Sequence, residues 1–169
     1  MIDVATRLEI ARPVEVVFAF VADQTNAPRW QPELHEVKRL TDGPLGVGSE
    51  HEFVRTFAGR RVASRNRFVA YEPDRFVAFE IPSGWITGHA SYRTEPTGSG
   101  GTVLTSRVQF HVHGAAAPFE RLLGRLFARD SRRAEARLRQ LLENGAGGGT
   151  GVAASPRDSG ASSSANGDT

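Results

Sequence analysis

The sequence predicts an α+β fold in which a curved antiparallel sheet of about seven strands wraps around a long C-terminal helix. Between residues 33 and 113, six strand-like segments follow one another with only turn-forming residues between them, which is typical of an antiparallel meander. From Pro118 to Gly145 the apolar residues change to the spacing of one amphipathic helix. A helix of about 26 residues is about 39 Å long, enough to cover the apolar face of such a sheet.

The first 30 residues predict one strand and two short helices. Apolar and polar residues alternate over residues 4–10, the period of a half-buried strand. Pro13 marks a first helical turn, with Glu15 near the positive helix end and apolar residues at helical spacing up to Val21. A second, brief helical turn covers residues 26–30.

The six strands of the meander pair in a register that two tight turns predict. A two-residue hairpin loop at residues 58–59 and a turn at residues 72–75 set the pairing. The strands are expected at residues 33–41, 48–57, 60–71, 75–81, 86–95 and 102–113. The expected pairs are Glu50 with Arg67, Glu52 with Arg65, Tyr71 with Phe76, Arg67 with Glu80, and Phe68 with Phe79.

This register divides the sheet into a charged face and a largely apolar face, because successive side chains of a strand point to opposite sides. The apolar face needs a cover, and the C-terminal helix is the long apolar element available for it. The apolar face carries His51, Phe53, Asn66, Phe68, Val77, Phe79 and Ile81 from the middle strands, and Leu104, Ser106, Val108, Phe110 and Val112 from the last strand.

Composition indicates one folded domain over residues 1–144 and a disordered tail over residues 145–169. The tail is rich in Gly, Ser and Ala, and such a segment cannot bury enough apolar surface to offset its chain entropy. The chain has no cysteine, which excludes disulfides, thiolate metal sites and a cysteine nucleophile.

Charge and hydropathy bear on the expected partners and location. The net charge is only +2, so nucleic-acid binding is not expected. The N-terminus lacks the apolar core of a signal peptide, and no stretch approaches about 20 consecutive apolar residues. A cytoplasmic location is therefore expected, with peripheral contact to a membrane still open.

Short motifs of turn, cap and core residues accompany this order of elements, at residues 11–18, 23–30, 46–49, 71–75, 95–96, 101–102 and 138–143. The motifs and the order of the elements together resemble the helix-grip fold of the SRPBCC (START/Bet v 1-like) superfamily, of the polyketide cyclase/dehydrase and lipid-transport type. The resemblance implies a cavity between sheet and helix that binds a lipid, sterol, polyketide, quinone or plant hormone, and some members catalyse aromatic cyclisation or dehydration there.

The candidate ligand-binding residues are the side chains expected around that cavity. They are Trp30, Phe53, Arg55, Phe68, Val77, Phe79, Ile81, Trp85, Tyr92, Val108, Phe110, Leu123, Leu126, Phe127 and Asp130. Arg55 is expected to meet an acidic ligand group or to be a solvated edge residue. Asp130 either enters the cavity or pairs with Arg133 on the surface. The two tryptophans either line the entrance or fill the core.

His51 and Asn66 are the candidate catalytic residues, because the register makes them cross-strand neighbours on the cavity face. An imidazole could remove a proton next to a carbonyl, and an amide could hold the resulting enolate oxygen. The alternative is a hydrogen-bonded pair without a catalytic role. No metal or cofactor is expected, since His111 and His113 have metal-ligand spacing but face outward without a third ligand.

Three functions remain open from the sequence. The first is binding of a small hydrophobic ligand. The second is a cyclase or dehydratase that works without a metal. The third is a module that contacts a membrane or a protein through the arginine-rich C-terminal helix, although a solvated helix face interleaved with Glu120 and Glu135 also explains those arginines.

Overall fold

The structure is a computed structural model that describes residues 1–57, 60–84, 86–114 and 120–145. The predicted hairpin loop at residues 58–59, Trp85 and nearly all of the predicted tail lie outside the described residues. The same holds for the side chains of Leu123 and Leu126 on the long helix.

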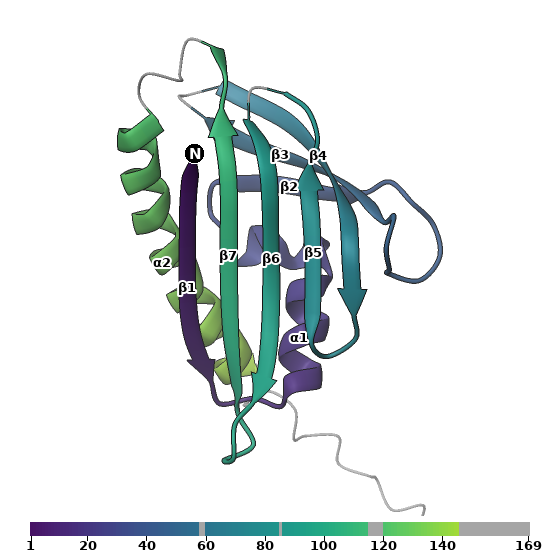
Figure 1. The fold of residues 1–169 in the computed structure, drawn as a ribbon. Helices are drawn as coiled ribbons and strands as arrows, with labels where there is room; N and C mark the ends of the chain where they lie inside the picture. Colours follow the sequence, from purple (N-terminus) through teal and green to yellow (C-terminus); the bar gives the residue numbers. More distant parts are fainter. Residues whose placement is uncertain (58–59, 85, 115–119, 146–169) are drawn as a thin grey trace, which may run out of the picture.

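The chain forms a seven-stranded sheet, two helical segments that follow the first strand, and one long C-terminal helix (Figure 1). The sheet order is β1-β7-β6-β5-β4-β3-β2, and every neighbouring pair is antiparallel. This confirms the predicted α+β, helix-grip fold. The elements are β1 (Ile2–Ile10), α1 (Val14–Ala22), the 3-10 helix η1 (Gln24–Arg29), β2 (Leu34–Arg39), β3 (Glu50–Phe57), β4 (Arg60–Glu72), β5 (Phe76–Ile81), β6 (Ile86–Pro96), β7 (Thr102–Val112) and α2 (Glu120–Asn144).

Local sequence explains where the first helices begin. Pro13 directly precedes α1, where its fixed φ suits the entry to a helix, and Glu15 lies in the first turn. Asp23 caps η1 by accepting a hydrogen bond from the backbone N–H of Thr25. These two short segments bring the chain from β1 back across the sheet to β2.

The register of the middle strands follows the predicted pairing except at one turn. Four predicted pairs are confirmed: Glu50 with Arg67, Glu52 with Arg65, Arg67 with Glu80, and Phe68 with Phe79. Tyr71 does not lie opposite Phe76, because Glu72 takes that place in a turn where Asp74 adopts a left-handed φ of 60°.

A β-bulge between Phe68 and Ala70 absorbs the extra residue, so the predicted register holds on its N-terminal side, at Arg67 and Phe68. The bulge changes which face Tyr71 occupies. Tyr71 now lies on the same face as Phe68, with the two ring centroids 6.3 Å apart, while Val69 is exposed. The bulge therefore adds one aromatic ring to the apolar side of the sheet.

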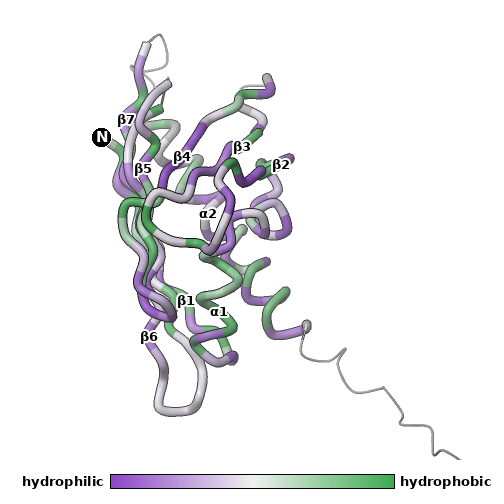
Figure 2. Tube along the Cα trace, turned by 90° about the vertical axis from the view of Figure 1, so that its right-hand side faces the viewer, coloured by the Kyte–Doolittle hydropathy of each residue, from purple (hydrophilic) through white to green (hydrophobic). Residues whose placement is uncertain are grey.

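The main core lies between the concave face of the sheet and the two helices. Val17, Phe18 and Val21 of α1 pack there together with Leu138 and Leu142 of α2. In Figure 2 the helical segments lie on one side of the curved sheet. The predicted arrangement, a sheet whose apolar face is covered by the C-terminal helix, is confirmed, and α1 supplies a second part of the cover.

Candidate ligand-binding site

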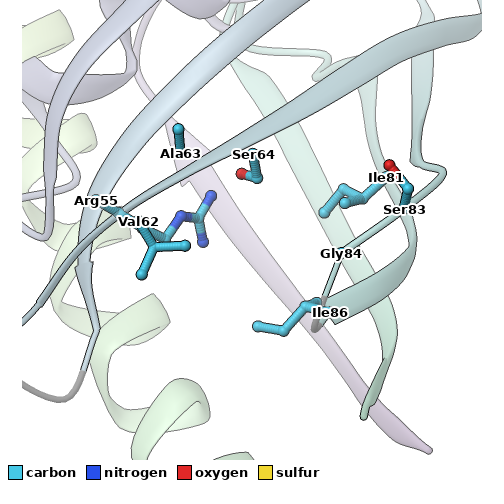
Figure 3. A pocket seen from close by; sticks show the side chains of 8 residues that line it. All are labelled: Arg55, Val62, Ala63, Ser64, Ile81, Ser83, Gly84 and Ile86. Carbon is cyan, nitrogen blue, oxygen red and sulfur yellow. The ribbon is translucent and has the colours of Figure 1, made fainter. Parts of the chain in front are cut away.

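A small pocket opens on the concave side of the sheet, near the ends of β3, β4 and β5 (Figure 3). Its volume is about 40 Å³, which is room for a few water molecules at most. Most of its walls are apolar, and one guanidinium group projects among them. The lining residues are Arg55, Val62, Ala63, Ser64, Ile81, Ser83, Gly84 and Ile86.

Arg55 supplies the positive charge of this pocket. Its Nε atom is buried and has no hydrogen-bond partner among the described residues, and its guanidinium carbon lies 5.9 Å from the centre of the Phe53 ring. Burial lowers the pKa of Arg55, while the carboxylate of Glu33 nearby acts in the opposite direction. A guanidinium in this setting remains charged, so it favours a carboxylate, a phosphate or an enolate oxygen.

Tyr92 forms a second polar point on the same face. Its side chain is buried, and burial raises the pKa of the phenol, while a hydrogen bond with Gln31 acts in the opposite direction. The Tyr92 ring meets Trp30 edge-on, with centroids 6.2 Å apart. Trp30 is itself buried, so its indole packs in the core next to Tyr92.

His51 and Asn66 are cross-strand neighbours, as the register predicted, and Arg39 of β2 continues the same row. His51 is fully buried and Asn66 is 3% exposed. Both ring nitrogens of His51 and both amide atoms of Asn66 lack a well-formed hydrogen bond to any described residue. Two buried nitrogens of Arg39 are in the same situation.

The row is electrostatically unfavourable for a protonated imidazole. Burial lowers the pKa of His51, and the positive charge of Arg39 lowers it further. Asp23 and the amide of Asn66 act more weakly in the opposite direction. His51 is therefore a neutral imidazole at physiological pH, but it does not line the pocket at Arg55. It packs instead against Phe68, with ring centroids 5.1 Å apart.

The predicted apolar wall residues divide among the pocket and three packed clusters. Of the candidates, Arg55 and Ile81 line the pocket directly. Phe68, Val77, Phe79, Tyr92 and Trp30 belong to the main core, and Phe53 packs with Leu34 and Val37. Phe110 packs against Phe127 with ring centroids 5.1 Å apart, and Val108 and Ile86 border that cluster. Ile86 therefore links this third cluster to the pocket.

The prediction that Asp130 enters the cavity is wrong, because its side chain is exposed on the outer face of α2. The carboxylate that faces the sheet is Glu135, which is 8% exposed and had been expected on the solvated face. The hydroxyl of Thr6 donates a hydrogen bond to it. Glu135 lies three residues before Leu138 and seven before Leu142, and this spacing was the sequence signal that could have revealed it.

Burial raises the pKa of Glu135, while hydrogen bonds from Thr6 and Ser106 act in the opposite direction. Thr6 and Ser106 lie opposite each other on β1 and β7, so the carboxylate joins α2 to two strands at once. This carboxylate also lies close enough to Tyr92 to raise the pKa of the phenol. Glu135 and Tyr92 therefore belong to one polar patch in the interior of the protein.

Two further findings concern metals and membranes. Among the described residues, no three histidine or acidic side chains lie together so that they could hold a metal ion. His113 instead forms a hydrogen bond of 2.8 Å with the hydroxyl of Thr87. No helix within the described ranges is long and apolar enough to cross a lipid bilayer.

Comparison with known proteins now places this arrangement in a family. Residues 1–143 match the model of the polyketide cyclase / dehydrase and lipid transport family. The chain belongs to this family. The polyketide cyclase / dehydrase and lipid transport family thus covers the sheet, the pocket and almost all of α2. No match is found among curated protein sequences.

Solved structures share the fold of this family member at low sequence identity. TTHA0849 from Thermus thermophilus has a TM-score of 0.72 and 14% identity over 85% of this chain and 98% of that chain. The Zhui aromatase/cyclase from Streptomyces sp. R1128 has a TM-score of 0.70 and 18% identity over 89% and 98%. A START superfamily protein from Mycobacterium smegmatis has a TM-score of 0.66 and 18% identity over 83% and 99%. At such identities the likeness shows the fold alone.

Proposed function

We propose that this protein binds a small, mainly hydrophobic ligand that carries one acidic or enolic group. The observation that supports the proposal most directly is the Arg55 guanidinium, which projects among Val62, Ile81 and Ile86 in a mostly apolar pocket (Figure 3). A buried guanidinium nitrogen without a partner favours an anionic oxygen from a bound molecule. The apolar walls suit the rest of such a molecule.

The size of the pocket sets a condition on this function. A volume of about 40 Å³ accepts one small chemical group, whereas pockets that enclose a whole organic ligand usually measure about 300–1,000 Å³. Binding of a lipid or polyketide therefore requires the walls of this pocket to move apart. We expect the acidic group to enter at Arg55 and the apolar part to widen the space beside Ile81 and Ile86.

Two probes of equal chain length test this proposal, decanoate and decanol, because they differ in the group that Arg55 would recognise. The unmodified protein should bind decanoate about tenfold more tightly than decanol in calorimetry. Arg55→Met should remove that preference and leave decanol binding nearly unchanged. Arg65→Met is the matched control, since Arg65 is exposed on the opposite face of the sheet.

Mass spectrometry of the protein after gentle purification adds an independent measurement, because a retained hydrophobic acid would identify the natural ligand class. The proposal fails if the protein retains no small molecule and binds neither probe. The proposal that Arg55 recognises the acidic group fails if Arg55→Met binds decanoate as tightly as the unmodified protein does.

The second candidate function is cyclisation or dehydration of a polyketide, with His51 as general base and Asn66 as donor to the carbonyl oxygen. A specific observation favours it: burial and Arg39 keep His51 neutral, and a neutral imidazole is the form that accepts a proton. Because His51 is fully buried and lies away from the pocket at Arg55, this function requires the interior to open to the substrate. His51→Ala should then abolish turnover of an aromatic polyketide precursor while decanoate binding persists. Unchanged turnover in that variant would exclude this mechanism.

A further inference from the structure

The exposed side of α2 is rich in arginine. Packing decides which side of the helix this is, because Ala134, Leu138 and Leu142 face the sheet. The exposed arginines, here called the arginine face, are Arg125, Arg129, Arg132, Arg133, Arg137 and Arg139.

The arginine face has little negative charge to balance it. Arg139 pairs with Glu143, but no other member of the face has an ion pair with a residue whose side chain the structure describes. Asp130 is the one exposed acidic residue between Arg125 and Arg139, because Glu135 is buried against Thr6. The face therefore carries an excess of positive charge.

The spacing of these arginines is unfavourable for an isolated helix. Arg125, Arg129, Arg133 and Arg137 follow one another at intervals of four residues, so each guanidinium lies close to the next. Like charges at this interval destabilise a helix, and the row extends over about 18 Å. An anionic surface placed against the row would reverse this effect.

We propose that the arginine face docks this protein on the surface of an anionic membrane. Leu122 favours a membrane over a purely ionic partner, because it lies in the first turn of α2 and is 56% exposed, three residues before Arg125. An exposed apolar side chain beside a row of cations is typical of helices that lie at a lipid interface. This proposal does not depend on which ligand the pocket binds.

The position of the docking surface suits exchange of a hydrophobic molecule with the bilayer. α2 begins at the end of the molecule where β5 connects to β6 (Figure 1). Ser83 and Gly84 of that connection line the pocket at Arg55. Docking through the start of α2 therefore brings the pocket end of the protein toward the membrane.

Vesicle sedimentation with the full chain tests the proposal. We expect binding to vesicles that contain phosphatidylglycerol, no binding to vesicles of pure phosphatidylcholine, and loss of binding at high salt. Replacing Arg125, Arg129 and Arg133 together by Gln should weaken binding to the anionic vesicles about tenfold or more. Glutamine keeps the helix propensity, so circular dichroism should show an unchanged fold.

A variant with the same loss of charge is the matched control. Arg7, Arg65 and Arg75 are exposed away from α2, and their joint replacement by Gln should leave vesicle binding nearly unchanged. Equal weakening by the two triple variants would overturn the proposal, since net charge alone would then explain binding. Tighter binding to single-stranded RNA than to anionic vesicles, or no vesicle binding by the unmodified protein, would also overturn it. Decanoate binding should persist in both variants, which separates this test from that of the ligand pocket.

Discussion

The rings of His51 and Phe68 pack against each other inside the protein, with centroids 5.1 Å apart and an angle of 34° between the planes. The two residues come from neighbouring strands, and both are nearly inaccessible to solvent. The ring of His51 thus occupies the place of an aromatic core residue, although neither of its nitrogens has a well-formed hydrogen bond to a described residue. A buried polar atom without a partner destabilises the folded state.

The first prediction follows from this contact. His51→Phe should keep the packing against Phe68 and remove the two unsatisfied nitrogens, so the free energy of unfolding should rise by about 1–3 kcal/mol. His51→Ala should instead lower it, because the lost ring leaves a cavity. Urea unfolding at pH 8 measures both changes. A less stable His51→Phe protein would show that the imidazole nitrogens make hydrogen bonds that stabilise the fold.

The second prediction concerns acid sensitivity. The pKa of His51 in the folded protein lies below its ordinary value of 6.5, because burial and Arg39 disfavour the charged ring. The unfolded chain therefore binds the proton more tightly, and stability is lost as the pH falls below 6.5. His51→Phe should remove the part of the acid-induced loss of stability that comes from protonation of His51. Thermal unfolding between pH 5 and 8 measures the difference, which should widen toward pH 5.

Glu135 provides a third prediction with the opposite sign. Burial raises its pKa above the ordinary value of 4.5, so the folded protein binds the proton more tightly than the unfolded chain. Its contribution to stability is complete below pH 4.5 and is lost as the pH rises through the raised pKa. Glu135→Gln should therefore be more stable than the unmodified protein at pH 8, because the amide stays neutral and its oxygen still accepts from Thr6.

Glu143 is the control for Glu135 on the same helix. It accepts a hydrogen bond from the backbone N–H of Ala11, which lowers its pKa, so its ionised form stabilises the fold above pH 4.5. Glu143→Gln should lose stability at pH 8, the reverse of Glu135→Gln. If Glu135→Gln and Glu143→Gln changed the stability at pH 8 equally, the conclusion that burial raises the pKa of Glu135 would be wrong.

The fourth prediction concerns Gly88 in β6. A Cβ atom at this position would lie 2.1 Å from the backbone oxygen of Gln109 and 2.7 Å from the Cα of Phe110, both on β7. Gly88→Ala must therefore displace the backbone, and we expect a loss of about 1–3 kcal/mol in the free energy of unfolding. Gly98→Ala is the control, because a Cβ there meets no atom within 4 Å. Chemical denaturation of the two variants should separate them clearly.

The sequence by itself determined the order of the six meander strands, most of their register and the cover of the sheet, whereas the pairing of β1 with β7 came from the structure. These features depend on local patterns: the charge pairs between β3 and β4 agree with one register, and the apolar stripe of α2 has one helical period. The adjacency of His51 and Asn66 followed from the same register. Periodicity and turn length are properties of short segments, so they are readable without knowledge of distant contacts.

Only the tertiary structure decided which polar groups lie inside and where the pocket is. The rotation of α2 about its axis buries Glu135 and exposes Asp130, and this angle is set by packing against β1 and by the hydrogen bond from Thr6. His51 lies on the predicted face but away from the pocket at Arg55. The reason is physical: a strand pattern tells which side a residue faces, whereas the elements that pack over that side decide whether it meets a ligand or a neighbouring ring.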